Sequence, residues 1–156
     1  DARTGKIGGG LGRVVIVGGG DVAMDCASTA RQLGASSVTV SFVETMETMP
    51  AGKKELFYAV DLGAYVIPAF KPVEILGGES VKGLKLVSMD GDSSMELAAE
   101  TVIFAVGQKA SDDYRGLQQG GKIWIGGDLQ NGGRTVVEAV ASGKEAAKAI
   151  AEALKI

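Results

Sequence analysis

The sequence contains no histidine and only one cysteine, Cys26, among its 156 residues. Without histidine, Ser-His-Asp triads, Cys-His pairs and histidine-ligated metal sites are excluded. A single cysteine cannot form an intrachain disulfide, a CxxC redox pair or the ligand set of an iron–sulfur cluster. These absences exclude most side-chain nucleophile and metal chemistry, and they favour a binding function.

Long apolar runs and an excess of positive charge are also missing. No stretch approaches the roughly 20 apolar residues that a membrane helix requires, and the N-terminus lacks the apolar centre of a signal peptide. The 16 basic and 19 acidic residues give a net charge of −3, which argues against non-specific nucleic-acid binding. We therefore expect a cytoplasmic protein with neither a membrane nor a nucleic acid as partner.

Glycine, by contrast, is abundant: the chain has 24, and they cluster. Residues 1–13 are glycine-rich and are expected to form a flexible lead-in or linker. The first residue is Asp1 and not Met, so we expect the chain to be a piece of a longer polypeptide. The whole chain is 46% hydrophobic. Its length and composition suffice for one globular unit with its own core.

Alternating strand and helix patterns predict an α/β fold. Residues 14–17 are apolar at every position, as in a strand buried on both faces of a parallel sheet, and three glycines follow. Apolar residues then recur at helical spacing up to Gly34, and residues 38–42 form a second strand pattern. Strand, glycine turn, helix and strand make a right-handed βαβ unit.

The middle of the chain continues this pattern and then changes character. A short helix closed by Gly63 and a strand over 64–67 come first. Three short runs separated by hairpin signals follow, and they predict an antiparallel meander laid beside the parallel sheet. These runs are 73–76, 81–89 and 95–98, and a further apolar strand is expected over 101–106.

The rest of the chain is expected to contain a loop, one short strand and a long helix. The loop covers 111–121 and the strand 123–125. The final helix carries one apolar face that is expected to pack closely, formed by Val136, Val140, Gly143, Ala147, Ile150 and Leu154. The sequence thus predicts a Rossmann-type, three-layer α/β fold with a parallel sheet and a small antiparallel meander.

The glycines after the first strand match the G-x-G-x-x-A fingerprint of dinucleotide-binding folds. Gly18 permits the tight turn, Gly20 lets a pyrophosphate approach the backbone, and Ala23 allows close helix–strand packing. The helix start offers N–H groups and a positive dipole end to the phosphates. The predicted site comprises Gly18, Gly19, Gly20, Asp21, Val22 and Ala23. The alternative is a structural glycine turn in another α/β protein.

The fingerprint also predicts an acidic residue about 20 residues further on, at the end of the second strand. Val43 and Glu44 stand at this place. The Glu44 carboxylate would accept a hydrogen bond from the ribose 2′-OH of a bound dinucleotide. Its alternative role is that of a solvated loop acid.

Several motifs occur in a fixed order along the chain. They are VVIVGGGDVAMDCA at 14–27, MPA at 49–51, PVEILG at 72–77, FAVGQ at 104–108, GGD at 126–128 and TVVEAVASG at 135–143. In this order they resemble the glutamate synthase small subunit family, which includes the flavoprotein region of dihydropyrimidine dehydrogenase. The resemblance implies a module in which NAD(P)H reduces FAD, and electrons pass to iron–sulfur clusters in neighbouring domains or subunits.

The resemblance also implies roles for residues outside the glycine turn. It implies dinucleotide contacts at Val106, Gly107 and Gln108. It implies flavin contacts at Gly127 and Asp128, where the carboxylate would accept a hydrogen bond from the ribityl chain. From the residues alone, 126–128 would be a helix-entry turn.

The resemblance favours NADH over NADPH. Family members that use NADPH carry Tyr-Arg-Arg after the second strand, where this chain has Phe42, Val43 and Glu44. An apolar residue and an acid therefore replace the arginines that pair with the 2′-phosphate. We expect NAD(H) as the cofactor, with NADP(H) as the second candidate.

Two departures from the family concern the flavin. The family's FAD-binding glycine motif is missing before residue 14, and the stretch between the 104–108 and 126–128 motifs is short. We therefore expect FAD to bind only when the rest of the flavin domain is supplied, by a remaining flavoprotein domain or a larger iron–sulfur subunit. The expected division is an NAD(P)-binding domain over 14–110 and a closing part of the FAD domain over 111–156, packed as one globular unit.

The resulting prediction is an NADH-binding domain of a flavoprotein oxidoreductase that is not catalytic alone. No catalytic residue and no metal ligand is assigned, since the chemistry of such enzymes belongs to their cofactors. Two other classes stay open. One is a methyltransferase-like domain that binds S-adenosylmethionine, which also uses a glycine-rich first loop. The other is a non-catalytic Rossmann-type interaction module.

Overall fold

The computed structural model describes residues 10–109, 111–114, 116–133 and 135–155. It divides into two compact units, 1–106 and 107–156, which are described separately below. Most of the expected lead-in, residues 1–9, lies outside the described residues. The expected boundary at 110–111, and the packing of both parts into one globular unit, stay predictions.

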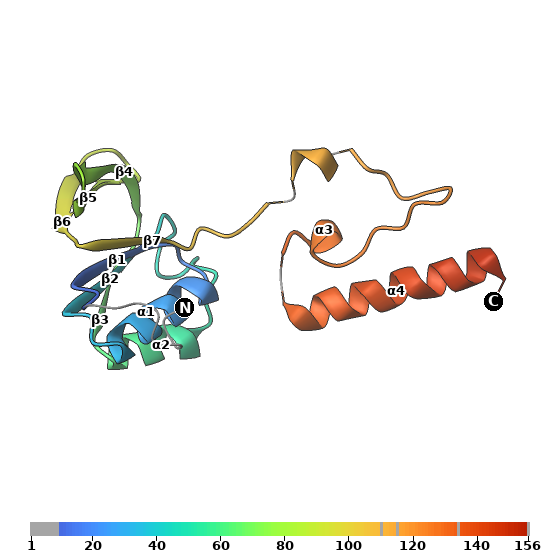
Figure 1. Ribbon diagram of the computed structural model, residues 1–156, viewed down its shortest axis with the longest axis horizontal. Coiled ribbons are helices and arrows are strands. Elements are labelled where there is room, and N and C mark those ends of the chain that lie inside the picture. Colours follow the sequence, from blue (N-terminus) through green and yellow to red (C-terminus); the bar gives the residue numbers. More distant parts are fainter. Residues whose placement is uncertain (1–9, 110, 115, 134, 156) are drawn as a thin grey trace. The chain divides into compact units, whose positions relative to one another are not determined.

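Within its described residues, 10–106, the first unit contains a parallel sheet, two helices and an antiparallel sheet (Figure 1). The parallel sheet has the strand order β3-β2-β1-β7, and the antiparallel sheet has the order β4-β5-β6. The parallel strands are β1 (Arg13–Val17), β2 (Ser37–Ser41), β3 (Ala64–Ile67) and β7 (Thr101–Phe104). The other elements are α1 (Asp21–Gln32), α2 (Lys53–Asp61), β4 (Phe70–Gly77), β5 (Val81–Ser88) and β6 (Ser94–Ala98).

The three-layer α/β architecture is confirmed, because β1 is buried on both faces. Successive side chains of a strand point to opposite faces of the sheet. Val14 and Ile16 pack into a core with α1 and α2, whereas Val15 and Val17 pack against Leu84 and other residues of the antiparallel sheet. Figure 1 shows the two helices on one face of the parallel sheet and β4 to β6 on the other. The meander therefore covers the sheet face-on.

The order of the strands creates a switch point at β1. The chain runs from β1 through α1 to β2 and through α2 to β3, moving steadily to one side. It then crosses through the antiparallel sheet and adds β7 on the other side of β1, parallel to it. In open α/β sheets, ligands bind outside the carboxyl ends of the strands at such a point. The glycine turn at 18–20 begins there.

The described part of the second unit contains three helical segments: η2 (Asp112–Tyr114), α3 (Asp128–Asn131) and α4 (Val136–Leu154). The prediction of a strand over 123–125 is wrong. Within the described residues of this unit, an isolated bridge joins Gly120 to Ile123, each donating its N–H to the other's carbonyl at 3.0 Å. The bridge closes a tight turn, so the short apolar run has no neighbouring strand along which to extend.

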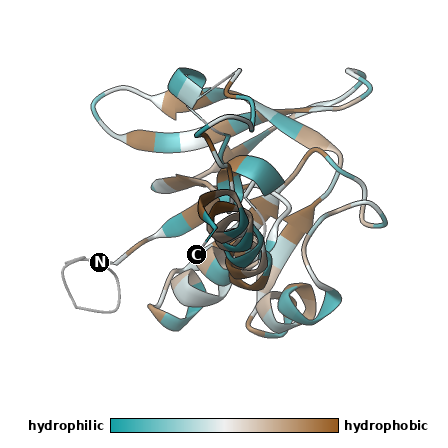
Figure 2. Ribbon diagram, turned by 90° about the vertical axis from the view of Figure 1, so that its right-hand side faces the viewer, coloured by the Kyte–Doolittle hydropathy of each residue, from teal (hydrophilic) through white to brown (hydrophobic). Residues whose placement is uncertain are grey.

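The predicted final helix is confirmed as α4, but the environment of its apolar face differs from the expectation. Thr135 and Glu138 form a capping box that satisfies the first turn. Within the second unit, Val136, Val140 and Leu154 are 80%, 50% and 59% exposed. Figure 2 shows hydrophobic and hydrophilic residues together along this helix. Hydrogen bonds join α4 to the α3 region, from Ser142 to Gln130 and from Gly127 to Ser142.

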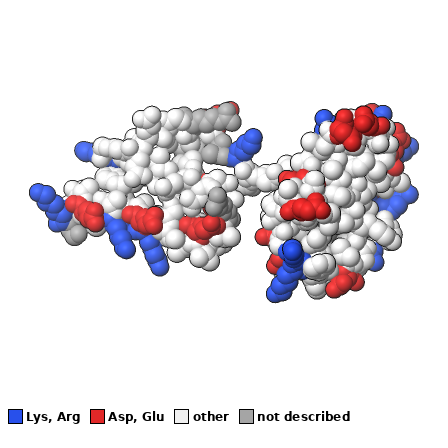
Figure 3. Space-filling model, turned by 180° about the vertical axis from the view of Figure 1, so that it is seen from behind, with Lys and Arg blue, Asp and Glu red and all other residues white. Residues whose placement is uncertain are grey.

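The surface of the described chain is mixed in charge. In Figure 3, Lys and Arg side chains are interspersed with Asp and Glu, and no large basic area is visible on that side. No described helix combines the length and the apolar character needed to cross a membrane.

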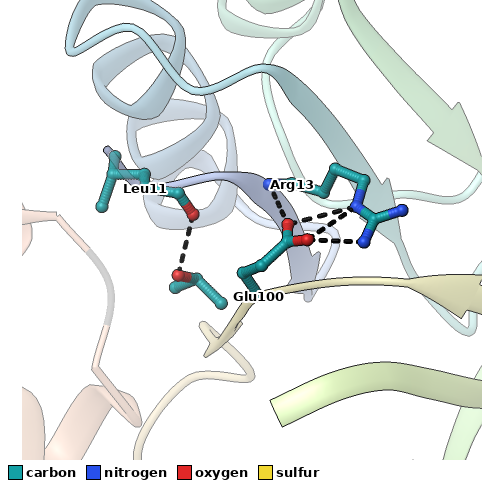
Figure 4. A network of polar contacts seen from close by, with 4 residues as sticks. Leu11, Arg13 and Glu100 are labelled. Carbon is teal, nitrogen blue, oxygen red and sulfur yellow. Dashed lines mark hydrogen bonds and ion pairs between the residues drawn. The ribbon is translucent and has the colours of Figure 1, made fainter. Parts of the chain in front are cut away.

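At its amino-terminal edge, the parallel sheet is joined by one ion pair (Figure 4). The Glu100 carboxylate accepts hydrogen bonds from the backbone N–H of Arg13 and from its guanidinium, with Nε 3.0 Å from Oε1. Next to it, the Thr101 hydroxyl donates to the Leu11 carbonyl at 3.0 Å. The bonds from the Arg13 side chain, and then from its backbone, lower the pKa of Glu100 from its ordinary value of 4.5 to about 2.

This ion pair predicts an acid-dependent loss of stability. A carboxyl whose pKa is lowered by folding stabilises the folded state above its unfolded pKa, and the contribution disappears as the pH falls towards the folded pKa. Glu100→Gln should therefore be less stable than the native chain at neutral pH. The difference should shrink from pH 4.5 downwards and vanish near pH 2. Urea unfolding at several pH values measures it, and a pH-independent difference would contradict the assignment.

Candidate dinucleotide-binding site

Gly18 lies where the carboxyl ends of three strands meet. Its N–H donates to the Ser41 carbonyl at the end of β2, at 2.8 Å. Its φ is +140°, and an ideal Cβ built there would lie 2.2 Å from the Ala105 carbonyl oxygen, just after β7. Both observations require glycine at this position. The predicted tight turn therefore also serves as the point of close backbone approach between β1 and β7.

Gly20 stands in open space at the start of α1. It is the N-cap residue, in an extended conformation with φ −95° and ψ 174°, and its carbonyl accepts hydrogen bonds from Ala23 and Met24. An ideal Cβ at Gly20 would have no atom within 4 Å. The first N–H groups of an α-helix have no acceptor within that helix. Free space beside unpaired donors and a positive dipole end fits a diphosphate group.

The next two residues of the fingerprint play different parts. Ala23 is fully buried in the core between α1 and the sheet. A small side chain there lets the helix lie close to β1, as the fingerprint requires. Val22 is 65% exposed on the first turn of α1. It therefore belongs to the surface beside the glycine turn and not to the core.

Glu44 lies beside the glycine turn, where the spacing in the sequence predicted an acid. Its carbonyl accepts a hydrogen bond from the Ala69 N–H at 2.8 Å, which fixes the backbone after β2. Its carboxylate Oε2 would be 2.9 Å from an ideal Cβ at Gly19. The side chain is half-buried, whereas the neighbouring Val43 is exposed. The structure thus brings Glu44 to the edge of the glycine turn.

The segment before α2 is also bound to the glycine turn, which the sequence did not indicate. The Ala51 N–H donates to the Gly19 carbonyl at 2.9 Å, and the Gly52 N–H donates to Asp21 Oδ1 at 2.8 Å. In the sequence, the MPA motif at 49–51 indicated only a resemblance to the family and no contact with the glycine turn. The Pro-Ala-Gly run directly before α2 could have indicated this contact, because it places the backbone N–H groups of Ala51 and Gly52 at the start of a helix.

The other predicted contacts fall at or beyond the boundary between the units. Val106 ends the first unit and is exposed, whereas Gly107 and Gln108 begin the second. Gly127 has φ +67° and caps α3, and its N–H donates to the Ser142 hydroxyl at 3.0 Å. Asp128 is the exposed first residue of α3. The helix-entry turn is therefore present, and the flavin contacts stay predictions.

Cys26 lies on the core side of α1 and is partly buried. Burial, and then the neighbouring Asp25 charge, raise the pKa of its thiol. The thiolate is the nucleophilic form of cysteine, and these surroundings disfavour it. The surroundings of Cys26 therefore favour the thiol over the reactive thiolate.

A βαβ unit with a glycine turn at the switch point, an open helix start and an adjacent acid defines a Rossmann-type dinucleotide-binding domain. The amino-acid sequence agrees with that class. It matches the family model described as pyridine nucleotide-disulphide oxidoreductase over residues 2–140. The chain belongs to this family.

Curated relatives confirm the resemblance noted from the motifs. The chain is 39% identical over 150 residues to the "NAD-dependent dihydropyrimidine dehydrogenase subunit PreT" of Escherichia coli K12, covering 87% of this chain and 35% of that protein. It is 30% identical over 182 residues to "Glutamate synthase [NADPH] small chain" of Halomonas elongata, covering 92% and 39%. The chain thus spans somewhat over a third of the length of these relatives.

Solved structures show the same fold. Thioredoxin reductase from T. acidophilum aligns with a TM-score of 0.75 at 19% identity, covering 92% of this chain and 53% of that one. The Lactococcus lactis thioredoxin reductase aligns with a TM-score of 0.71 at 21% identity, covering 90% and 53%. At these identities the likeness establishes the fold alone.

The two glycines at the ends of the turn should respond differently to a methyl group. Gly18→Ala places a Cβ against the Ala105 carbonyl and forces an unfavourable φ, so it should destabilise the fold by about 2–4 kcal/mol. Gly20→Ala meets no atom within 4 Å and should change stability by less than about 0.5 kcal/mol. Urea unfolding followed by circular dichroism compares them. Equal stability of both variants would show that the close approach at Gly18 is wrongly placed.

Proposed function

We propose that the first unit binds NAD(P)H, with a preference for NADH. The observation that carries the proposal is the open space at Gly20, bordered by the start of α1 and lying at the switch point of the sheet. The diphosphate of the dinucleotide lies against the backbone there. Backbone N–H groups of the first turn of α1 bind its oxygens.

The ribose of the adenosine half lies next to Glu44. The half-buried carboxylate beside Gly19 accepts the hydrogen bonds of the ribose hydroxyls. A 2′-phosphate at that place meets a negative charge and no arginine, since Val43 and Glu44 stand in the family's arginine positions. The relatives at 38–39% identity are named as NAD-dependent proteins, which supports the same preference.

The chain acts as part of a larger flavoprotein oxidoreductase. NAD(P)H bound to the first unit delivers hydride to FAD, and electrons pass on to iron–sulfur partners. The rest of the flavin domain supplies the FAD-binding glycine turn, and Gly127 and Asp128 contribute the ribityl end. Support comes from the family match and from the named relatives, of which this chain covers 35–39%. The exposed apolar residues of α4 are the surface offered to that domain.

With a single cysteine, the chain cannot supply a redox-active dithiol for the electron transfer. Its single cysteine is partly buried and has a raised pKa. The first unit therefore contributes position and electrostatics, whereas the cofactors carry the electrons.

A variant with a blocked diphosphate space tests the proposed function. Val fits the extended backbone of Gly20, but its methyl groups fill the space beside the helix start. In calorimetric titration the native chain should bind NADH. Gly20→Val should stay folded and lose at least tenfold in affinity, which is about 1.4 kcal/mol or more.

The matched control is Gly78→Val, in the turn between β4 and β5, where an ideal Cβ also meets no atom within 4 Å. It should leave NADH binding unchanged. Unchanged binding by a folded Gly20→Val chain would remove the diphosphate from this turn. Binding of S-adenosylmethionine without NADH would favour the methyltransferase alternative, and binding of neither would favour an interaction module.

A second prediction concerns the relative affinities of the chain for NADH and NADPH. Unit charges of like sign about 4 Å apart repel by roughly 4 kcal/mol at an effective dielectric of 20, and salt and relaxation reduce this. The native chain should therefore prefer NADH by about 1–3 kcal/mol, or roughly ten- to a hundredfold. A Val43→Arg, Glu44→Arg double variant should gain NADPH affinity, because guanidinium groups pair with the 2′-phosphate.

Glu79→Arg is the control for the change of charge, since Glu79 lies exposed in the β4–β5 turn. It should leave the ratio of the two affinities near the native value. Equal or tighter NADPH binding by the native chain would show that Glu44 is a surface acid. A double variant without any gain in NADPH affinity would show that the ribose lies elsewhere.

A further inference from the structure

The segment between β2 and α2 is hydrogen-bonded at both of its ends, at one end to the chain between β3 and β4 and at the other to the glycine turn. At one end, the Glu44 carbonyl accepts the Ala69 N–H at 2.8 Å. At the other, the Ala51 N–H donates to Gly19 and the Gly52 N–H donates to the Asp21 carboxylate. We call residues 44–52 the ribose segment, since its first residue is the acid assigned to the ribose.

The middle of the ribose segment is stabilised by hydrogen bonds between its own residues. The Met49 N–H donates to the Thr45 carbonyl at 3.0 Å, and the Thr45 N–H donates to the Thr48 hydroxyl at 3.1 Å. These bonds make the chain between Glu44 and Gly52 a compact turn. The turn is the route by which a change at the Gly52 end would reach Glu44.

Within the described part of the chain, the Asp21 side chain bonds the start of α1 to this segment. Its carboxylate accepts a hydrogen bond at the start of α2, whose first N–H groups also need acceptors. Figure 1 shows α1 and α2 on the same face of the sheet. Although Asp21 is the first residue of α1, its charge is thus directed to the N-terminus of the neighbouring helix.

This direction matters for an anion bound at α1. A carboxylate at the start of α1 would compete with a diphosphate for the first-turn N–H groups. Bonding to Gly52 engages Asp21 Oδ1 at 2.8 Å and leaves the donors of α1 to the ligand. The Asp21 carboxylate is thereby compatible with phosphate binding at the start of α1.

We propose that Asp21 is a positioning residue that contacts no phosphate: through its hydrogen bond to Gly52 it fixes the ribose segment, and so sets the discrimination between NADH and NADPH made at Glu44. This inference rests on the proposed function of the first unit. It assigns to Asp21 a role different from the direct dinucleotide contact expected from its place in the fingerprint.

Two substitutions at Asp21 separate its hydrogen bond from its charge. Asp21→Asn keeps an acceptor oxygen but loses the charge, whereas Asp21→Ala loses both. If the hydrogen bond positions the segment, the Asn variant should resemble the native chain and the Ala variant should not. If the charge acts on the helix dipole or on the ligand, both variants should change alike. Asp25→Ala, an exposed acid one helical turn further along α1, is the control.

The first measurement is amide hydrogen exchange of the 45–52 region in the full chain without nucleotide. Asp21→Ala should speed exchange at Gly52 about fivefold or more, since the Gly52 N–H loses its acceptor. Asp21→Asn and Asp25→Ala should stay near the native rate. Unchanged exchange at Gly52 in the Ala variant would overturn the inference.

The second measurement is the ratio of NADH to NADPH affinity. Asp21→Ala should lower this ratio several-fold while binding of NADH persists, and Asp21→Asn should restore it. A native ratio in the Ala variant, or an equal change in both variants, would overturn the positioning role. A native chain that binds neither dinucleotide would overturn the proposed function and the discrimination that rests on it. The exchange measurement would then still decide whether Asp21 fixes the segment.

Discussion

The close approach of backbone at Gly18 is the constraint on which the site depends. Three strands end around this residue, and a carbonyl oxygen after β7 occupies the place where a Cβ would stand. Because β1 ends there, the chain turns out of the sheet and starts α1 at its edge. Ala23 then holds the helix close to β1. The first N–H groups of α1 are thereby fixed at the switch point of the sheet, and backbone geometry alone supplies the arrangement on which the proposed diphosphate site rests.

The sequence predicted the parts of the fold that depend on local pattern. The all-apolar run at 14–17, the glycine turn and the 20-residue spacing to Glu44 each reflect a local requirement, and the structure places them together. The run at 123–125 failed for the opposite reason. Its apolar character favoured a strand, but a strand needs a partner, and the turn at Gly120 and Ile123 supplies only one bridge within the described second unit.

The contacts of Asp21 show a second limit of sequence reasoning. Its position in the fingerprint suggested a ligand contact, yet its carboxylate is bonded 31 residues away, at the start of another helix. No periodicity or spacing encodes such a contact, since it depends on how α1 and α2 lie side by side. The same holds for the Arg13–Glu100 pair, which joins β1 to β7 across 87 residues. Side chains that connect separate elements become visible only in three dimensions.

Under the proposed function, the cofactors carry the redox chemistry and the chain positions them. Its negative charges near an anion site would seem to oppose this, but each has its own partner or place. Asp21 is bonded to the N-terminus of α2, and Glu44 lies beside Gly19, away from the open space at Gly20. Under the proposed function, different groups would serve the diphosphate and the ribose: backbone donors at the glycine turn for the first, and the Glu44 carboxylate for the second. The two lie on separate elements joined by the ribose segment. The choice of cofactor could therefore change without rebuilding the turn that would bind it.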